Sequence, residues 1–110
     1  MTSEFSKAER KTLRELSAFA YEAEAHQMLE ELDAEFQSWR AGEMESSELL
    51  RAIHEFHQDQ SRELWSRYQA LKEPEIVARG LALGPLKEPV PEELHAKLAP
   101  LVEFFGKHSE

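Results

Sequence analysis

The sequence predicts an all-α protein built on a long antiparallel helical hairpin. Apolar residues recur at intervals of three or four over residues 13–39 and again over 49–71. This spacing keeps one face of an α-helix apolar. Neither run contains proline, and Gly42 lies between them. We therefore expect one helix at about 4–40 and a second at about 46–72.

The residues between the two helices indicate how the chain reverses. Gly42 can adopt the left-handed backbone conformation that closes a helix at its C-terminus. Ser46 or Ser47 is expected to cap the second helix, with Glu48 in its first turn, where the helix dipole favours a negative charge. A connection this short makes the two helices antiparallel neighbours.

A reversal near residue 43 also predicts a register, in which residue i lies level with residue 86 − i. This register places Glu35 near Arg51 and Glu24 near Arg62. Exposed ion pairs of this kind contribute only about 0–1 kcal/mol each. We therefore use them as marks of the register and assign the stability to burial of the apolar faces.

Two shorter helices are expected after the hairpin. Pro74 is favourable in the first turn of a helix that runs to about Leu83, and Gly84 ends it. A fourth helix is predicted over about 91–106, and Pro100 should kink or divide it because proline removes a backbone hydrogen bond. Residues 73–110 are therefore read as a cover for the hairpin or as a docking segment.

The amount of apolar surface favours a dimer. Two helices cannot bury their own apolar faces, and residues 73–110 are too few to flank both along their full length. We expect a single helical domain over residues 1–110 that pairs two hairpins into a four-helix bundle by homodimerisation. The alternative is a monomer whose last two helices fold back over the hairpin.

Composition limits the classes of function. The 110 residues carry a formal charge of −9 and no cysteine, which excludes disulfides and cysteine-based catalysis or zinc binding. Residues 16–39 contain six acidic residues and no Lys or Arg. Such a surface disfavours nucleic acid and favours a basic protein partner. The sequence shows neither a signal peptide nor an apolar run long enough to span a membrane, so we expect a cytoplasmic protein.

One polar cluster falls on the predicted seam between the helices. Glu22, His26 and Glu30 recur every four residues, and the register places His57 and Gln60 opposite them. We interpret His26, His57 and Gln60 as a polar layer that specifies register and oligomeric state. The alternative is a site for Fe, Mn or Zn formed by Glu22, His26, Glu30 and His57. The structural layer is preferred because helical di-metal sites use Glu-x-x-His, a spacing that these residues lack.

No motif for catalysis or for a cofactor is present. We therefore expect a non-enzymatic protein that acts by self-association and protein–protein binding. Two alternatives remain: a metal-binding helical bundle, and an acidic inhibitor or antitoxin-like protein that masks a basic partner.

Overall fold

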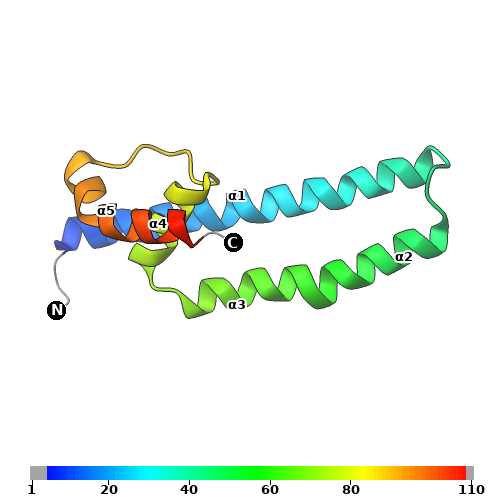
Figure 1. Ribbon diagram of the computed structural model, residues 1–110, viewed down its shortest axis with the longest axis horizontal. Helices are drawn as coiled ribbons and strands as arrows, with labels where there is room; N and C mark the ends of the chain where they lie inside the picture. The colour runs from blue at the N-terminus through cyan, green and yellow to red at the C-terminus, as the bar shows by residue number, and fades with distance from the viewer. Residues whose placement is uncertain (1–4, 109–110) are drawn as a thin grey trace. The chain divides into compact units, whose positions relative to one another are not determined.

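A computed structural model describes residues 5–108, and every regular element among them is helical (Figure 1). The all-α fold class is therefore confirmed. The elements in order are α1 (Lys7–Arg40), α2 (Ser46–Glu55), the π-helix η1 (Phe56–Ser61), α3 (Arg62–Ala70), α4 (Glu73–Leu83) and α5 (Glu92–Lys107). None of the helices in residues 5–108 has the length and apolar character that a membrane span requires.

The chain forms two compact units, a division that the sequence did not predict. The first unit comprises the described parts of residues 1–23 and 71–110, and the second comprises residues 24–70. Helix α1 contributes its first half to one unit and its second half to the other.

The first unit contains most of the hydrophobic core. Helices α4 and α5 pack against each other, and they bury their apolar faces together with the first half of α1. The buried apolar side chains of this unit are Leu13, Leu16, Ala20, Ile76, Val77, Ala78, Leu86, Leu94 and Leu98. Helices α4 and α5 thus cover the first half of α1 in the same chain.

Proline and glycine delimit the C-terminal helices largely as predicted. Pro74 lies in the first turn of α4, and Gly84 ends that helix with a left-handed φ of +98°. Helix α5 runs through Pro100 without interruption and bends partway along its length (Figure 1). Gly80 allows close packing inside the unit, because a Cβ atom there would lie 3.0 Å from Cβ of Leu86.

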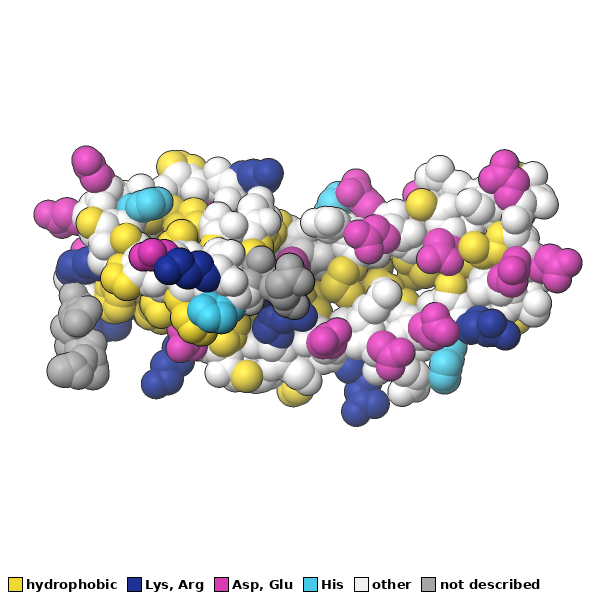
Figure 2. All heavy atoms as spheres, viewed as in Figure 1, with side chains coloured by type: hydrophobic (Ala, Val, Ile, Leu, Met, Phe, Trp, Pro, Cys, Tyr) yellow, Lys and Arg dark blue, Asp and Glu magenta, His cyan; other side chains and the backbone are white. Residues whose placement is uncertain are grey.

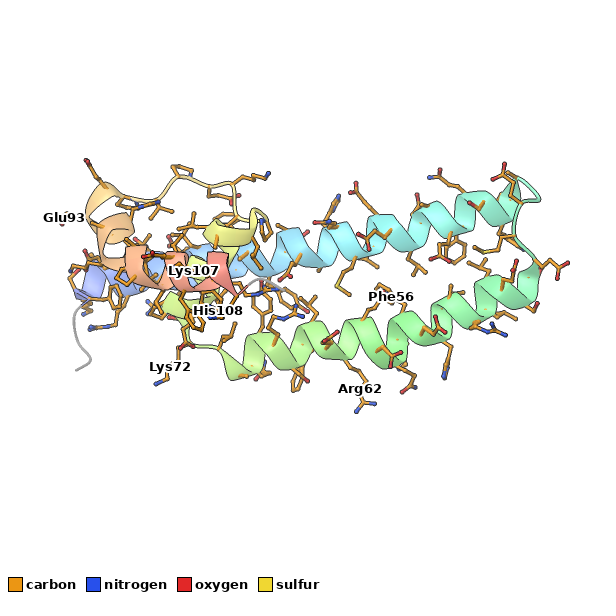
Figure 3. All side chains as sticks on the ribbon, in the orientation of Figure 1. Phe56, Arg62, Lys72, Glu93, Lys107 and His108 are labelled. Atoms are coloured by element: carbon orange, nitrogen blue, oxygen red, sulfur yellow. The ribbon has the colours of Figure 1, made fainter. Side chains whose placement is uncertain are left out.

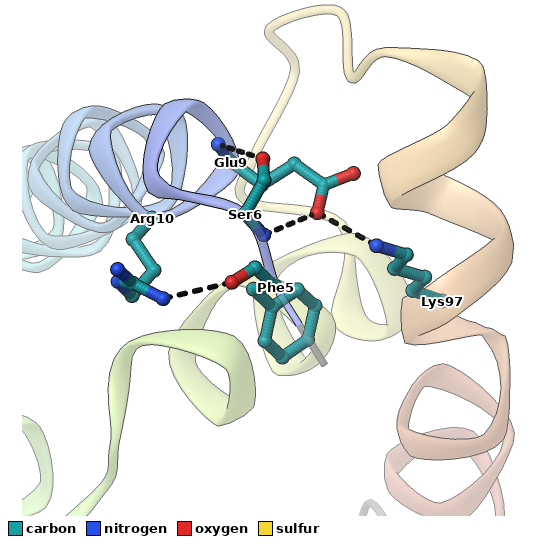
Figure 4. Close-up of polar contacts among 5 residues, drawn as sticks. All are labelled: Phe5, Ser6, Glu9, Arg10 and Lys97. Atoms are coloured by element: carbon teal, nitrogen blue, oxygen red, sulfur yellow. Dashed lines mark hydrogen bonds and ion pairs between the residues drawn. The ribbon is translucent and has the colours of Figure 1, made fainter. Parts of the chain in front are cut away.

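A capping box begins α1 and links it to α5 (Figure 4). Ser6 Oγ accepts a hydrogen bond from the backbone N–H of Glu9 at 3.0 Å, and the Glu9 carboxylate accepts one from the N–H of Ser6 at 2.9 Å. Lys97 Nζ on α5 donates to the same carboxylate at 2.8 Å. The helix therefore begins at Lys7, and the start predicted near residue 4 lies outside the described residues.

The second unit contains the turn of the predicted antiparallel hairpin and the helical segments next to it. Gly42 has a φ of +82°, and the N–H groups of Glu43 and Gly42 donate to the carbonyls of Ser38 and Trp39 at 2.9 and 3.1 Å. These two bonds form the Schellman motif, in which a left-handed residue satisfies the last carbonyls of a helix. The predicted role of Gly42 is confirmed.

The start of the second helix differs from the prediction. Glu45 occupies the N-cap position, and its N–H donates to the Glu48 carboxylate at 2.9 Å. Ser46 is already helical, and its Oγ instead accepts a hydrogen bond from the indole N–H of Trp39 at 3.0 Å. This bond joins the two helices beside the turn.

The predicted second helix at 46–72 is interrupted by η1. A π-helix bonds residue i to residue i+5 and so places more residues in each turn than an α-helix does. Beyond η1 the residues of α3 therefore meet α1 in a register that differs from the one expected for an unbroken α-helix. Among the apolar residues of this unit, only Leu49 and Leu64 are buried.

Candidate functional site

A groove lies in the second unit, between α1 and the α2–η1 segment, and more of its exposed lining is polar than apolar. Its volume is about 300 Å³. Leu32, Met44, Ala52 and Phe56 supply apolar surface to it. Figure 3 shows Phe56 lying between the two helices of the hairpin, whereas Arg62 points away from them. The groove is therefore part of the incompletely filled seam of a two-helix unit.

Four glutamates, namely Glu31, Glu35, Glu48 and Glu55, line the groove together with Arg51 and Gln60. Four carboxylates and one guanidinium give the lining a formal charge of −3. Glu35 and Arg51, which the sequence places level with each other, do line the same groove. Figure 2 shows apolar side chains in the seam of this unit and acidic side chains along the helices on both sides of it.

The charge of the protein is concentrated in this unit. Residues 24–70 contain eleven Asp or Glu and four Arg, a formal charge of −7 out of the −9 of the whole chain. Like charges this close together create a negative potential that attracts cationic groups and repels anionic ones. The groove is therefore suited to a cationic occupant that also has apolar groups for the smaller apolar part of the lining.

A second polar feature of the same unit joins α1 to α3. Tyr68 Oη donates to Glu24 Oε1 at 2.6 Å, and Arg67 Nη1 lies 3.4 Å from Glu24 Oε2. The Glu24 side chain is only 19% exposed. Hydrogen bonds to an ionised group are among the stronger ones in proteins, so this cluster fixes how α3 lies on α1.

This cluster corrects the predicted register. Glu24 was expected beside Arg62, but it is paired with residues five and six positions further along the chain. The π-helix shifts the register in this direction because it places extra residues between α2 and α3. Arg62 instead lies within 3.4 Å of the Gln58 side chain, on its own helical segment.

The predicted polar layer does not lie in the seam of the single chain. His26, His57 and Gln60 are exposed, although Gln60 reaches the rim of the groove. The reason is helical phase. Met28 is half-buried, and His26 lies two residues before it, which is about 200° around the helix. In this turn of α1 the residue that faces the seam is Glu24, two positions before His26, which was expected there.

The structure brings together only one pair of the predicted metal ligands. His26 Nε2 lies 3.2 Å from Glu30 Oε2, with the two side chains 64% and 70% exposed. Glu22 and His57 are exposed as well. Across residues 5–108 no three His, Asp or Glu side chains are grouped as a metal ion would require.

The sequence does contain a signal for the residue that was missed. Leu16, Ala20, Glu24, Met28, Leu32 and Phe36 recur at intervals of four along α1. Leu16 and Ala20 are buried, and the other four are half-buried. Glu24 is the one charged member of this stripe, which marks it as a carboxylate in need of a partner.

Comparisons of this chain with protein-family models, with curated proteins and with solved structures found no match.

Proposed function

We propose that this protein acts by binding a basic, amphipathic helix of a partner protein in the groove of the hairpin. One observation carries the proposal: four carboxylates line the groove beside a smaller apolar patch, in a unit with a charge of −7. A groove between two helices accepts the apolar face of a third helix, as in other helix-in-groove complexes. Lysine and arginine flanking that face would meet the glutamates.

Binding in this groove is also what an acidic inhibitor would require. An inhibitor or antitoxin-like protein masks a basic partner by covering its cationic surface, and the groove supplies both the charges and an apolar anchor point. The metal-binding alternative has no comparable support among residues 5–108, where no suitable ligand group is formed.

The test is a titration with a fluorescently labelled synthetic helix of leucine and lysine, with leucines at helical spacing on one face. We expect saturable binding that weakens as salt is added, because screening reduces the attraction between exposed charges. A peptide with the same leucines and with glutamate in place of lysine should not bind.

Charge-neutralising variants locate the binding site. Replacing Glu35, Glu48 and Glu55 together with glutamine removes three rim charges. At about 0.5 kcal/mol for each exposed pair, the affinity should fall roughly tenfold. The matched control replaces Glu92, Glu93 and Glu103 together with glutamine, which removes three exposed carboxylates from the first unit. Equal losses in both variants would show that the peptide responds to net charge alone and would reject the groove.

We propose in addition that the chain forms a homodimer. Only two apolar residues of the hairpin unit, Leu49 and Leu64, are buried, and Leu29, Leu50 and Trp65 are more than half exposed. A two-helix unit gains stability when a second pair of helices covers such residues. Light scattering coupled to size-exclusion chromatography tests this directly, and the mass of a single chain at micromolar concentration would contradict it.

A further inference from the structure

We infer that the homodimer forms through one face of the hairpin unit, the face that carries Leu29, Leu50 and Trp65, and that this leaves the acidic groove open. This inference rests on the proposed self-association and adds the surface that it uses. The three side chains are 55%, 66% and 60% exposed. Large apolar side chains with this exposure are a feature of interaction surfaces when they share a face.

Helical phase places the three residues on the same face. Leu50 directly follows the buried Leu49, and Trp65 directly follows the buried Leu64. One residue corresponds to about 100° around a helix, so both lie on the same side of the seam. Leu29 follows the half-buried Met28 in the same way. Because the two helices are antiparallel, the same rotation from the seam turns Leu29 on one helix and Leu50 and Trp65 on the other toward one face of the hairpin.

The acidic residues of the second helix lie on the opposite side. Glu48 precedes Leu49 and Glu63 precedes Leu64, so these carboxylates are rotated by about 100° in the other direction. Glu48 accordingly lines the groove, as does Glu55. On the α1 side, Glu31 precedes the half-buried Leu32 and also lines the groove.

This segregation of charge identifies the occupant as a second copy of the chain. Two units of charge −7 repel each other if they meet through their groove faces. On the opposite face, the positions between Leu50 and Trp65 include His54, His57 and Arg62, and none of these residues is acidic. The neighbouring part of α1 carries Glu30 and Asp33 there. A two-fold axis that packs α1 of one copy on α2–α3 of the other brings these carboxylates toward Arg62, as isologous pairing requires.

The experiment compares the masses of single-site variants in solution. Leu50→Glu and Trp65→Glu each place a charge on the proposed interface, at positions whose exposure makes them neutral to folding. We expect the wild type to have the mass of two chains and both variants to have the mass of one. Phe104→Glu is the matched control, since Phe104 is 51% exposed but lies in the first unit, and it should retain the mass of two chains.

The outcomes separate the three proposals. Dimeric Leu50→Glu and Trp65→Glu variants would overturn the assignment of this face while leaving self-association intact. A monomeric wild type would overturn self-association itself. Undiminished binding of the leucine–lysine peptide by monomeric Leu50→Glu would support the placement of the two surfaces on opposite faces, and loss of binding in that variant with unchanged helicity would contradict it.

Discussion

The hydrogen bond from Tyr68 to Glu24 provides a sharp test of how the hairpin is aligned. Tyr68→Phe removes the hydroxyl and keeps the ring. The bond is 2.6 Å long and ends on a carboxylate that is 19% exposed. Hydrogen bonds to charged groups contribute about 1.5–3 kcal/mol. Because Arg67 still accompanies the carboxylate in the variant, we expect a loss near the lower end, about 1.5 kcal/mol.

Urea unfolding followed by tryptophan fluorescence is the appropriate assay. Trp39 and Trp65 both belong to residues 24–70, so the signal reports on the unit that contains the bond. Combining Tyr68→Phe with Glu24→Gln completes a double-mutant cycle, in which groups in direct contact couple by about 0.5–3 kcal/mol. Glu30→Gln is the control. Glu30 and its partner His26 are both largely exposed, so this substitution should lower the free energy of unfolding by less than about 0.5 kcal/mol.

Two results would refute the alignment. One is a Tyr68→Phe variant as stable as the wild type. The other is a double-mutant cycle in which Glu24 couples to Arg62 and not to Tyr68, since Glu24 and Arg62 would lie level only in the register of an unbroken α-helix.

Three further predictions concern the core, the capping box and the turn. Leu98→Ala should destabilise the first unit by about 2–5 kcal/mol, because the side chain is fully buried. Thermal or urea unfolding followed by circular dichroism measures this loss. The more exposed Leu83→Ala should cost much less, and equal costs would contradict the placement of the core. Lys97 and the Ser6 N–H lower the pKa of Glu9 below its ordinary value of 4.5, so the carboxylate stabilises the folded state above pH 4.5 and this contribution disappears as the pH falls through the lowered pKa. Glu9→Gln should therefore flatten the acid limb of the stability–pH curve, and an unchanged limb would argue against the contact. Gly42→Ala should cost about 1 kcal/mol in unfolding experiments, because a left-handed φ of +82° strains any residue with a Cβ atom; a neutral or stabilising effect would mean that the turn has another conformation.

The ends of the helices could be read from the sequence because local chemistry determines them. Gly42 and Gly84 adopt left-handed conformations that other residues avoid, and Pro74 is favoured in the first turn of a helix. The exceptions are also local. The prediction of a serine cap missed that Glu48 satisfies the N–H of Glu45 while Ser46 binds Trp39.

The candidate site was only partly predictable. The acidic surface and the presence of Glu35 and Arg51 at one groove follow from composition and register. His26 is exposed in the single chain because a shift of two residues moves a side chain from the seam to solvent. Glu24 was overlooked as a seam residue, although its place in a four-residue apolar repeat distinguishes it from the other acids.

The sequence by itself determined that this chain is helical, where most of its helices begin and end, that it reverses at Gly42, and that its negative charge is concentrated between residues 24 and 70. These properties follow from periodicity, backbone preferences and composition, which act over a few residues. Only the tertiary structure decided that the core forms between α4, α5 and the first half of α1, that η1 alters the register, and that the hairpin contains a groove. Those features depend on which of several apolar faces pack together. The sequence pattern does not distinguish these packing arrangements, because their free energies depend on contacts between residues far apart in the chain.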